Sequence, residues 1–155
     1  TYSKLHGFDV TVLRYFTVYG PAGRPDMAPF RFINWCLQGE EIQLYGDGKQ
    51  SRDFTFVDDI AFGTIAALEK RLRGFEVINL GGGGERTTML EMIELIGKLS
   101  HKTPKVTLLP VAPGDMTHTS ASIDKAEKLL GWKPGTSLES GLAKTIQWHT
   151  EQLEL

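Results

Sequence analysis

The polar residues best placed to bind a ligand follow one apolar strand near the start of the chain. The strand is predicted over residues 8–16, and the segment after it contains Thr17, two Gly-Pro or Arg-Pro turns and the polar pair Arg24 and Asp26. In open α/β sheets, ligands bind beyond the carboxyl ends of the strands. This strand exit is therefore a candidate binding site, but the spacing of its residues alone does not favour that interpretation over an ordinary exit closed by aromatic side chains.

A second pattern, from Tyr45 to Lys49, has the Tyr-x-x-x-Lys spacing of a catalytic pair. That spacing is useful only in a helix, which puts residues i and i+4 on one face. Gly46, Asp47 and Gly48 lie between the two residues and oppose a helix. We interpret the match as a coincidence.

A run of four glycines, residues 81–84, separates a predicted strand from a predicted helix, where dinucleotide-binding glycines are found. The third glycine of a G-x-G-x-x-G motif would fall on Arg86, and no strand–helix–strand unit with a suitably spaced acidic residue follows. The pattern favours a tight strand-to-helix connection over a phosphate-binding loop.

Composition excludes several classes of protein. The 155 residues carry 17 Lys+Arg and 19 Asp+Glu, a net charge of −2, and no basic run of the kind that binds nucleic acid. No apolar stretch approaches the roughly 18 residues of a membrane span. A single cysteine, Cys36, excludes an internal disulfide and fits a reducing, cytoplasmic compartment. The four histidines show no metal-binding spacing, so we predict no metal site.

Strands that alternate with helices predict an α/β architecture. We expect strands at 8–16, 42–45, 52–56, 75–80 and 106–109, and helices at 1–6, 30–37, 58–73, 88–99, 122–130 and 138–152. Residues 46–51 are predicted to form a hairpin-like excursion. The composition of strand 8–16 predicts burial with a neighbour on each edge. Because the chain opens on what reads as a helix end, we expect an earlier segment to be missing.

Several blocks carry a family resemblance in one order along the chain. They are the strand exit at 13–27, the segment 46–60 with its Ser51-Arg52-Asp53-Phe54 core, Asn79-Leu80-Gly81, Pro113-Gly114-Asp115, and the segment 128–134. Together they resemble the extended short-chain dehydrogenase/reductase family of NAD-dependent nucleotide-sugar epimerases and dehydratases, above all the UDP-glucuronate 4-epimerases. The resemblance implies NAD as the cofactor of the complete enzyme, a UDP-sugar as substrate and a homo-oligomer.

In that family a glycine-rich loop, a Ser/Thr and a Tyr-x-x-x-Lys pair precede the strand that corresponds to residues 8–16. The resemblance therefore implies that this α/β chain is the C-terminal, substrate-binding part of an extended Rossmann-type epimerase, with strand 8–16 left over from the nucleotide-binding sheet. Residues 1–20 would end the Rossmann-type domain, and residues 21–155 would form the substrate-binding domain. We expect no catalytic residue in the chain, no turnover by it alone, and poor binding of NAD to it.

The resemblance also implies roles for residues at the strand exit. Tyr15 and Phe16 would lie near the nicotinamide, and Thr17 would face the sugar. Arg24 would lie near the sugar carboxylate, which a guanidinium can bind through two hydrogen bonds. The alternative for Arg24 is an ordinary surface arginine.

The remaining implied roles concern the uridine diphosphate. Gln43 and Tyr45 would border the uracil, Arg52 would meet the diphosphate, and Asp115 would accept hydrogen bonds from the ribose hydroxyls. Relatives often carry arginine where this chain has Ala112, so phosphate binding would depend more on Arg52. A local ion pair with the adjacent aspartate is the alternative for Arg52.

Three other functions stay open. A UDP-glucuronate decarboxylase and a nucleotide-sugar 4,6-dehydratase are the alternatives within the enzyme class. A non-catalytic module for nucleotide-sugar binding or oligomerisation is the alternative outside it. An unpaired strand edge would favour association between copies.

Overall fold

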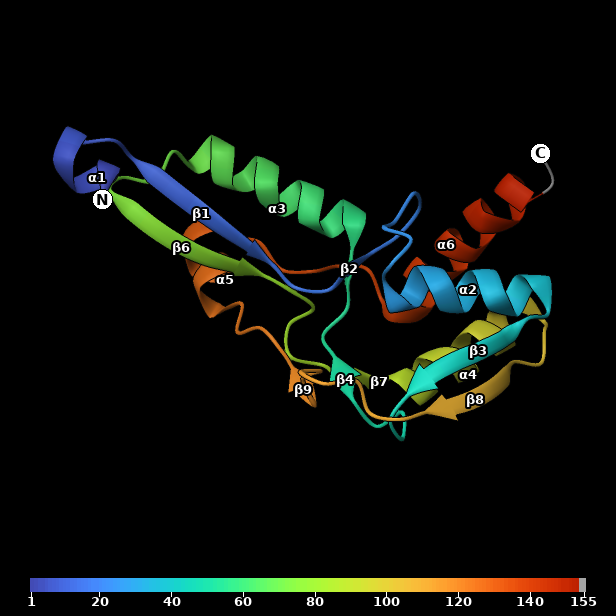
Figure 1. The fold of residues 1–155 in the computed structure, drawn as a ribbon. Helices are drawn as coiled ribbons and strands as arrows, with labels where there is room; N and C mark the ends of the chain where they lie inside the picture. The colour runs from blue at the N-terminus through green and yellow to red at the C-terminus, as the bar shows by residue number, and fades with distance from the viewer. Residues whose placement is uncertain (154–155) are drawn as a thin grey trace.

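The computed structural model describes residues 1–153, which divide between two cores (Figure 1). The elements in chain order are α1 Tyr2–His6, β1 Val10–Tyr15, β2 Val18–Tyr19, α2 Ala28–Gln38, β3 Glu41–Tyr45, β4 Ser51–Arg52, β5 Thr55–Phe56, α3 Val57–Lys70, β6 Phe75–Leu80, β7 Thr87–Thr88, α4 Met89–Ser100, β8 Lys105–Leu109, β9 His118–Thr119, α5 Asp124–Leu130 and α6 Leu138–Leu153. This order confirms the predicted α/β class. None of the described helices has the length and apolar character needed to cross a membrane.

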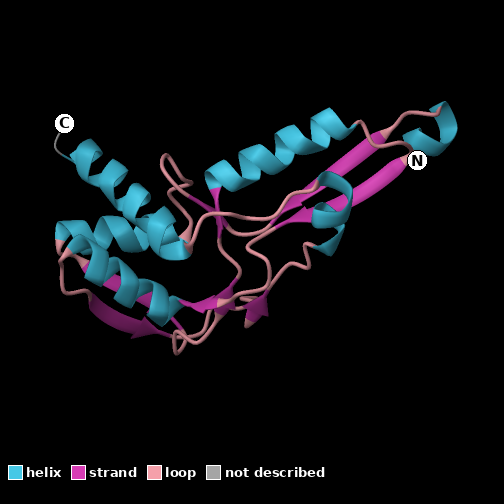
Figure 2. Cartoon of the chain, turned by 180° about the vertical axis from the view of Figure 1, so that it is seen from behind, coloured by secondary structure: helices cyan, strands magenta, loops and turns pink. Residues whose placement is uncertain are grey.

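The first core lies between a two-stranded parallel sheet and two helices. β1 pairs with β6 in a register that puts Leu13 beside Ile78. α3 and α5 both pack against the side chains of this sheet, in one cluster with Leu13 and Ile78. Figure 2 shows the two helices beside the paired strands from behind. Trp132 closes this core, and its Nε1 donates a hydrogen bond to the Asp59 carbonyl oxygen over 2.9 Å. Burial of each large aliphatic side chain here contributes roughly 1.5–3 kcal/mol.

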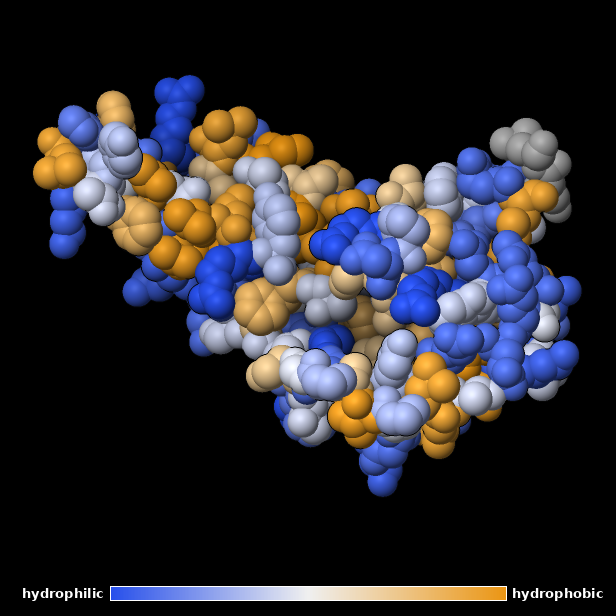
Figure 3. Space-filling model, viewed as in Figure 1, coloured by the Kyte–Doolittle hydropathy of each residue, from blue (hydrophilic) through white to orange (hydrophobic). Residues whose placement is uncertain are grey.

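β1 is more exposed than its composition predicts. It pairs with β6 on one edge, and within residues 1–153 no strand is hydrogen-bonded to its other edge. Val12 is 39% and Tyr15 51% exposed. Hydrophobic side chains gather on the surface over β1 and α3 (Figure 3). The burial expected from composition is therefore wrong for the described residues, because β-branched composition favours a strand without determining what packs beside it. The family resemblance implied instead that this strand keeps an unpaired edge and exposed apolar surface here, and the described residues agree with that expectation.

The second core forms where three helices cover a second parallel sheet. β3 pairs with β8 from Glu41 opposite Lys105 to Tyr45 opposite Leu109, and α2, α4 and α6 pack together over it. The fully buried side chains are those of Ile33, Ile42, Leu44, Met92, Ile96 and Leu142. α2 ends at Gly39 with φ 72°, as the sequence predicts.

The predicted hairpin at residues 46–51 is wrong. β3 pairs with β8, whereas β4 lies between β7 and β9 in a separate three-stranded sheet. The carbonyl oxygens of the connecting segment instead accept hydrogen bonds from the start of α4, from Leu90 N to Gly48 and from Met89 N to Gln50. The segment that connects β3 to β4 is therefore held by hydrogen bonds to the start of α4, and the two strands do not pair with each other.

His149 couples the packing of α2 and α6 to pH. Its side chain is buried, and Nδ1 lies 2.8 Å from Asn34 Oδ1. Burial lowers the pKa of His149 below its ordinary value. The unfolded chain then binds more protons than the folded one below about pH 6.5, so this contribution to stability is complete above that pH and is lost as pH falls toward the folded pKa.

We expect the free energy of unfolding to decrease between pH 7 and pH 5, and His149→Phe to reduce that dependence. Denaturant titrations at both pH values measure the difference. His101→Asn is the matched control, because His101 is exposed and Asn tolerates its left-handed backbone. Equal pH dependence in wild type and His149→Phe would contradict the account.

Candidate functional site

The chain leaves β1 through a strained residue. Thr17 has φ 27°, a conformation that β-branched residues rarely adopt. Thr55 holds it there, because its Oγ1 donates to the Phe16 carbonyl over 3.0 Å and its backbone N donates to the Thr17 carbonyl over 3.1 Å. Strain of this kind persists only where the surroundings enforce it, and it collects at ligand sites.

Most of the residues predicted to bind substrate line one cavity of about 240 Å³, which we call the Arg52 cavity. These residues are Thr17, Gln43, Tyr45, Arg52 and Asp115. They come from the exit of β1, from β3, from β4 and from the loop after β8. Segments that are distant in sequence therefore meet in one concave site, the usual form of a small-molecule site.

Arg52 and Asp115 bind each other across this cavity. Arg52 Nη2 lies 2.5 Å from Asp115 Oδ1, and the two side chains are 17% and 35% exposed. Arg52 Nη1 also donates to the Ser51 carbonyl oxygen over 3.0 Å. A guanidinium carries further N–H donors, so this pairing leaves some free for the oxygens of a ligand.

The alternative of a local pair between Arg52 and Asp53 is wrong. The Asp53 side chain is fully buried, and its Oδ2 accepts a hydrogen bond from Ala121 N over 2.9 Å. A Cβ on Gly82 would lie 2.0 Å from Asp53 Oδ1, so only glycine fits there. This close approach confirms that the glycine run is a tight connection after β6.

The first turn of α2 also faces the Arg52 cavity. Met27, Ala28 and Pro29 all contribute to its lining. Met27 occupies the N-cap position, and no side chain there accepts a hydrogen bond from the first N–H groups of the helix. Met27 N donates to the Arg24 carbonyl oxygen and Pro29 has no N–H, so the first turn offers the N–H groups of Ala28 and Phe30. These groups and the helix dipole favour a negative charge at this position.

Arg24 and Tyr15 line a neighbouring cavity of about 460 Å³, the Arg24 cavity, which shares Thr17 and Met27 with the Arg52 cavity. Arg24 is exposed and binds Asp26, with Nε 3.1 Å from Oδ1. This ion pair lowers the pKa of the Asp26 carboxyl and raises that of Arg24.

The two residues expected near the nicotinamide differ in exposure. The half-exposed Tyr15 hydroxyl lies 3.0 Å from Thr64 Oγ1. Phe16 lines neither of these two cavities, and it packs against Gly81, where a Cβ would lie 3.3 Å from Phe16 Cβ.

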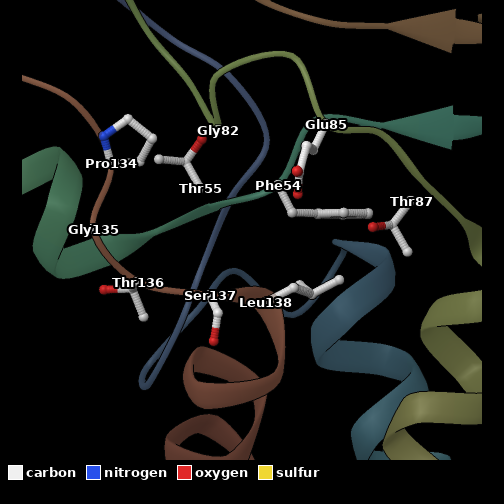
Figure 4. A pocket seen from close by; sticks show the side chains of 10 residues that line it. All are labelled: Phe54, Thr55, Gly82, Glu85, Thr87, Pro134, Gly135, Thr136, Ser137 and Leu138. Carbon is white, nitrogen blue, oxygen red and sulfur yellow. The ribbon is translucent and has the colours of Figure 1, made fainter.

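A third cavity, of about 310 Å³, differs in chemistry. This Thr136 cavity lies between Phe54 and Thr55, the loop after β6 and the segment before α6 (Figure 4). Phe54 also lines the Arg52 cavity. The polar side chains of the Thr136 cavity are hydroxyls and the carboxylate of Glu85, with no lysine or arginine. It offers no cation to a phosphate. Within residues 1–153, no three His, Cys, Asp or Glu side chains form a group that could hold a metal ion.

Several residues of the Arg52 cavity were not predicted from the sequence. They are Arg31, Phe32, Leu44, Gln50, Phe54 and Met89, besides the helix start described above. Arg31 had a recognisable signal, since it lies two residues after Pro29 and therefore in the first turn of the predicted helix. Side chains in a helix point back toward its N-terminus.

Comparison with known proteins gives a consistent picture. The model of the NAD dependent epimerase/dehydratase family matches residues 1–81, just over half of the chain. A UDP-glucuronate 4-epimerase of Thermodesulfobacterium geofontis is 50% identical over all 155 residues, which cover 47% of that protein. A UDP-N-acetyl-alpha-D-glucosaminuronate decarboxylase of Bacillus cytotoxicus is 36% identical over 95% of the chain and 48% of its own length.

Solved structures agree in fold. The UDP-glucuronic acid 4-epimerase of Bacillus cereus, in complex with UDP-glucuronic acid and NAD, superposes with a TM-score of 0.91 at 41% identity, over 97% of this chain and 48% of that one. The UDP-glucose 4-epimerase of Thermotoga maritima, with UDP-glucose, gives 0.91 at 32% identity, over 98% and 49%. The chain thus has the α/β fold of part of a Rossmann-type epimerase and spans about half the length of the relatives it matches.

Proposed function

The chain belongs to the NAD dependent epimerase/dehydratase family, and on that premise we propose that it binds the UDP-sugar of an NAD-dependent UDP-glucuronate 4-epimerase. The observation that carries this proposal is the Arg52 cavity. It gathers the predicted substrate residues around an arginine, a helix N-terminus and an aspartate. Arginine and uncapped N–H groups suit a diphosphate, and a carboxylate suits ribose hydroxyls.

In this proposal the parts of the ligand take the places that the family resemblance implies for the residues of the cavity. Gln43 and Tyr45 on β3 border the uracil, and Asp115 accepts hydrogen bonds from the ribose hydroxyls. Arg52 and the start of α2 bind the diphosphate. Thr17 then faces the sugar, and because it belongs to both cavities, the glucuronate carboxylate points toward Arg24.

NAD, when bound, supplies the hydride acceptor and donor for oxidation and reduction at the sugar C4. Tyr15 is the residue of this chain best suited to lie near the nicotinamide, since it is half-exposed at the carboxyl end of β1. The catalytic tyrosine and lysine and the phosphate-binding glycines of the family have no counterpart in residues 1–155. We therefore propose that these residues bind substrate without turning it over.

The open edge of β1 supports a division of the chain into the end of a Rossmann-type domain and a substrate-binding domain. Residues 1–20 end a Rossmann-type domain in this proposal. The boundary expected after residue 20 is revised, because β6, α3 and α5, which lie within residues 21–155, pack with β1 and so belong to the Rossmann-type part. The second core forms the substrate-binding domain. Exposed strand edges and apolar faces recruit partners, which supports a homo-oligomer. The oligomer and the cytoplasmic location both stay predictions.

Titration calorimetry of the purified chain with UDP-glucuronate tests the function. We expect saturable binding, competition by UDP, and no epimer when NAD is added. A chain that binds neither UDP nor UDP-glucuronate would contradict the substrate site. Formation of UDP-galacturonate by the chain alone would contradict the proposal that these residues bind substrate without turning it over.

A further inference from the structure

We propose that Arg31 supplies a second positive charge to the diphosphate-binding part of the Arg52 cavity. This inference rests on the proposed function and deepens it, because it concerns how the ligand's charge is balanced. Arg31 lies on α2, on a different element from Arg52 on β4, and both line the same cavity. A diphosphate between them would meet cations from two elements.

Arg31 lies near the end of its helix that faces the cavity. It lies three residues after the first residue of α2, where the helix dipole favours a negative charge, and its guanidinium rests on Trp35 of the next turn. The guanidinium is partly held in place, since its Cζ lies 4.5 Å from the ring centroid of Trp35. Stacking of this kind leaves the in-plane N–H donors free for a ligand. The helix dipole and Arg31 therefore favour a negative charge at the same place.

The ion pairs of the cavity leave Arg31 without a counter-charge. Four charged side chains line the cavity, and both acids are already bound: Asp26 pairs with Arg24, and Asp115 pairs with Arg52. Within residues 1–153, no carboxylate lies within ion-pair distance of Arg31, and its side chain donates no hydrogen bond. When Arg24 of the neighbouring cavity is counted with them, three arginines face two aspartates here, and Arg31 is the arginine without an ion-pair partner among the described residues. An anionic ligand would neutralise it.

The diphosphate is the part of the ligand that this charge fits. The sugar carboxylate points toward Arg24 in the neighbouring cavity, of which Arg31 is not a part. The uracil is neutral and borders β3. Arginine binds phosphate oxygens through parallel N–H donors, so Arg31 and Arg52 together can contact both phosphates.

Calorimetry of Arg31→Gln, with Arg31→Lys and Arg86→Gln as matched variants, tests this role. Arg86 is exposed and lies outside the cavity. We expect Arg31→Gln to weaken UDP binding about tenfold or more and uridine binding by less than about twofold. Arg31→Lys should recover part of the loss, and Arg86→Gln should bind UDP like wild type. Arg31→Gln should lose the same factor of affinity for UDP-glucose as for UDP-glucuronate, because the two ligands share the diphosphate. Thermal unfolding of each variant checks that the fold is intact.

The outcomes separate this inference from the function on which it rests. Wild-type binding of UDP with no loss in Arg31→Gln would overturn the role of Arg31 and leave the proposed function standing. A loss confined to UDP-glucuronate would overturn it as well, because Arg31 would then contact the sugar carboxylate. Equal losses for uridine and UDP would show a structural role. Failure of the wild-type chain to bind UDP would overturn both proposals.

Discussion

Arg52→Gln is expected to weaken the binding of UDP-glucuronate by about a hundredfold or more. The substitution weakens binding of the ligand in two ways. It removes a charged donor that binds phosphate, and it leaves the Asp115 carboxylate without its partner at 2.5 Å. An unpaired carboxylate beside the diphosphate repels it. Titration calorimetry at one fixed ionic strength measures the loss, since salt screens such contacts.

Arg73→Gln is the matched control for this prediction. Arg73 also pairs with an aspartate, with Nη1 3.0 Å from Asp9 Oδ2, but its side chain is 91% exposed and lies outside the Arg52 cavity. We expect it to bind UDP-glucuronate like wild type. An Arg52→Gln protein that binds as tightly as the Arg73→Gln protein would show that the diphosphate does not contact Arg52.

Gly82→Ala is expected to lower the free energy of unfolding by about 3 kcal/mol or more. The added Cβ would lie 2.0 Å from Asp53 Oδ1 and 2.7 Å from the Phe54 carbonyl oxygen. Asp53 is fully buried and bound to Ala121, so neither neighbour can move without breaking the contact between β4 and the loop after β9. Denaturant unfolding measures the change.

Gly135→Ala separates this steric effect from a general cost of replacing glycine. A Cβ at position 135 would lie 3.8 Å from Asp59 Oδ1, an ordinary contact, and its backbone does not have a positive φ. We expect its stability to lie close to that of wild type. If Gly82→Ala were as stable as Gly135→Ala, the tight packing against Asp53 would be refuted.

Local sequence signals predict the helices well, because the chemistry of a helix end lies within a few residues. Thr88 and Glu91 form the capping box that begins α4, and Gly39 ends α2 in the left-handed conformation. The short strands could not be predicted in this way. β4 is two residues long and gains its order from β7 and β9, which lie far along the chain. Such pairing depends on the packed fold rather than on local propensity.

The candidate site was predictable only in part, and for a related reason. The family resemblance identified Arg52 and Asp115, but it gave no sign that they bind each other. Arg31 belongs to no recognised block, and its place in the cavity depends on how α2 packs against β3. Residue types alone therefore predict which groups can bind a phosphate, whereas the charge balance of the cavity requires the structure.

The most direct test of the central claim locates the ligand on the chain. Backbone amide shifts of the isotope-labelled protein can be followed while UDP-glucuronate is added. We predict that the largest changes fall on Thr17, Gln43, Tyr45, Arg52 and the first turn of α2, while Thr87, Thr136 and Ser137 of the Thr136 cavity stay unchanged. Shifts centred on the Thr136 cavity, or none at saturating ligand, would contradict the assignment of the Arg52 cavity as the UDP-sugar site.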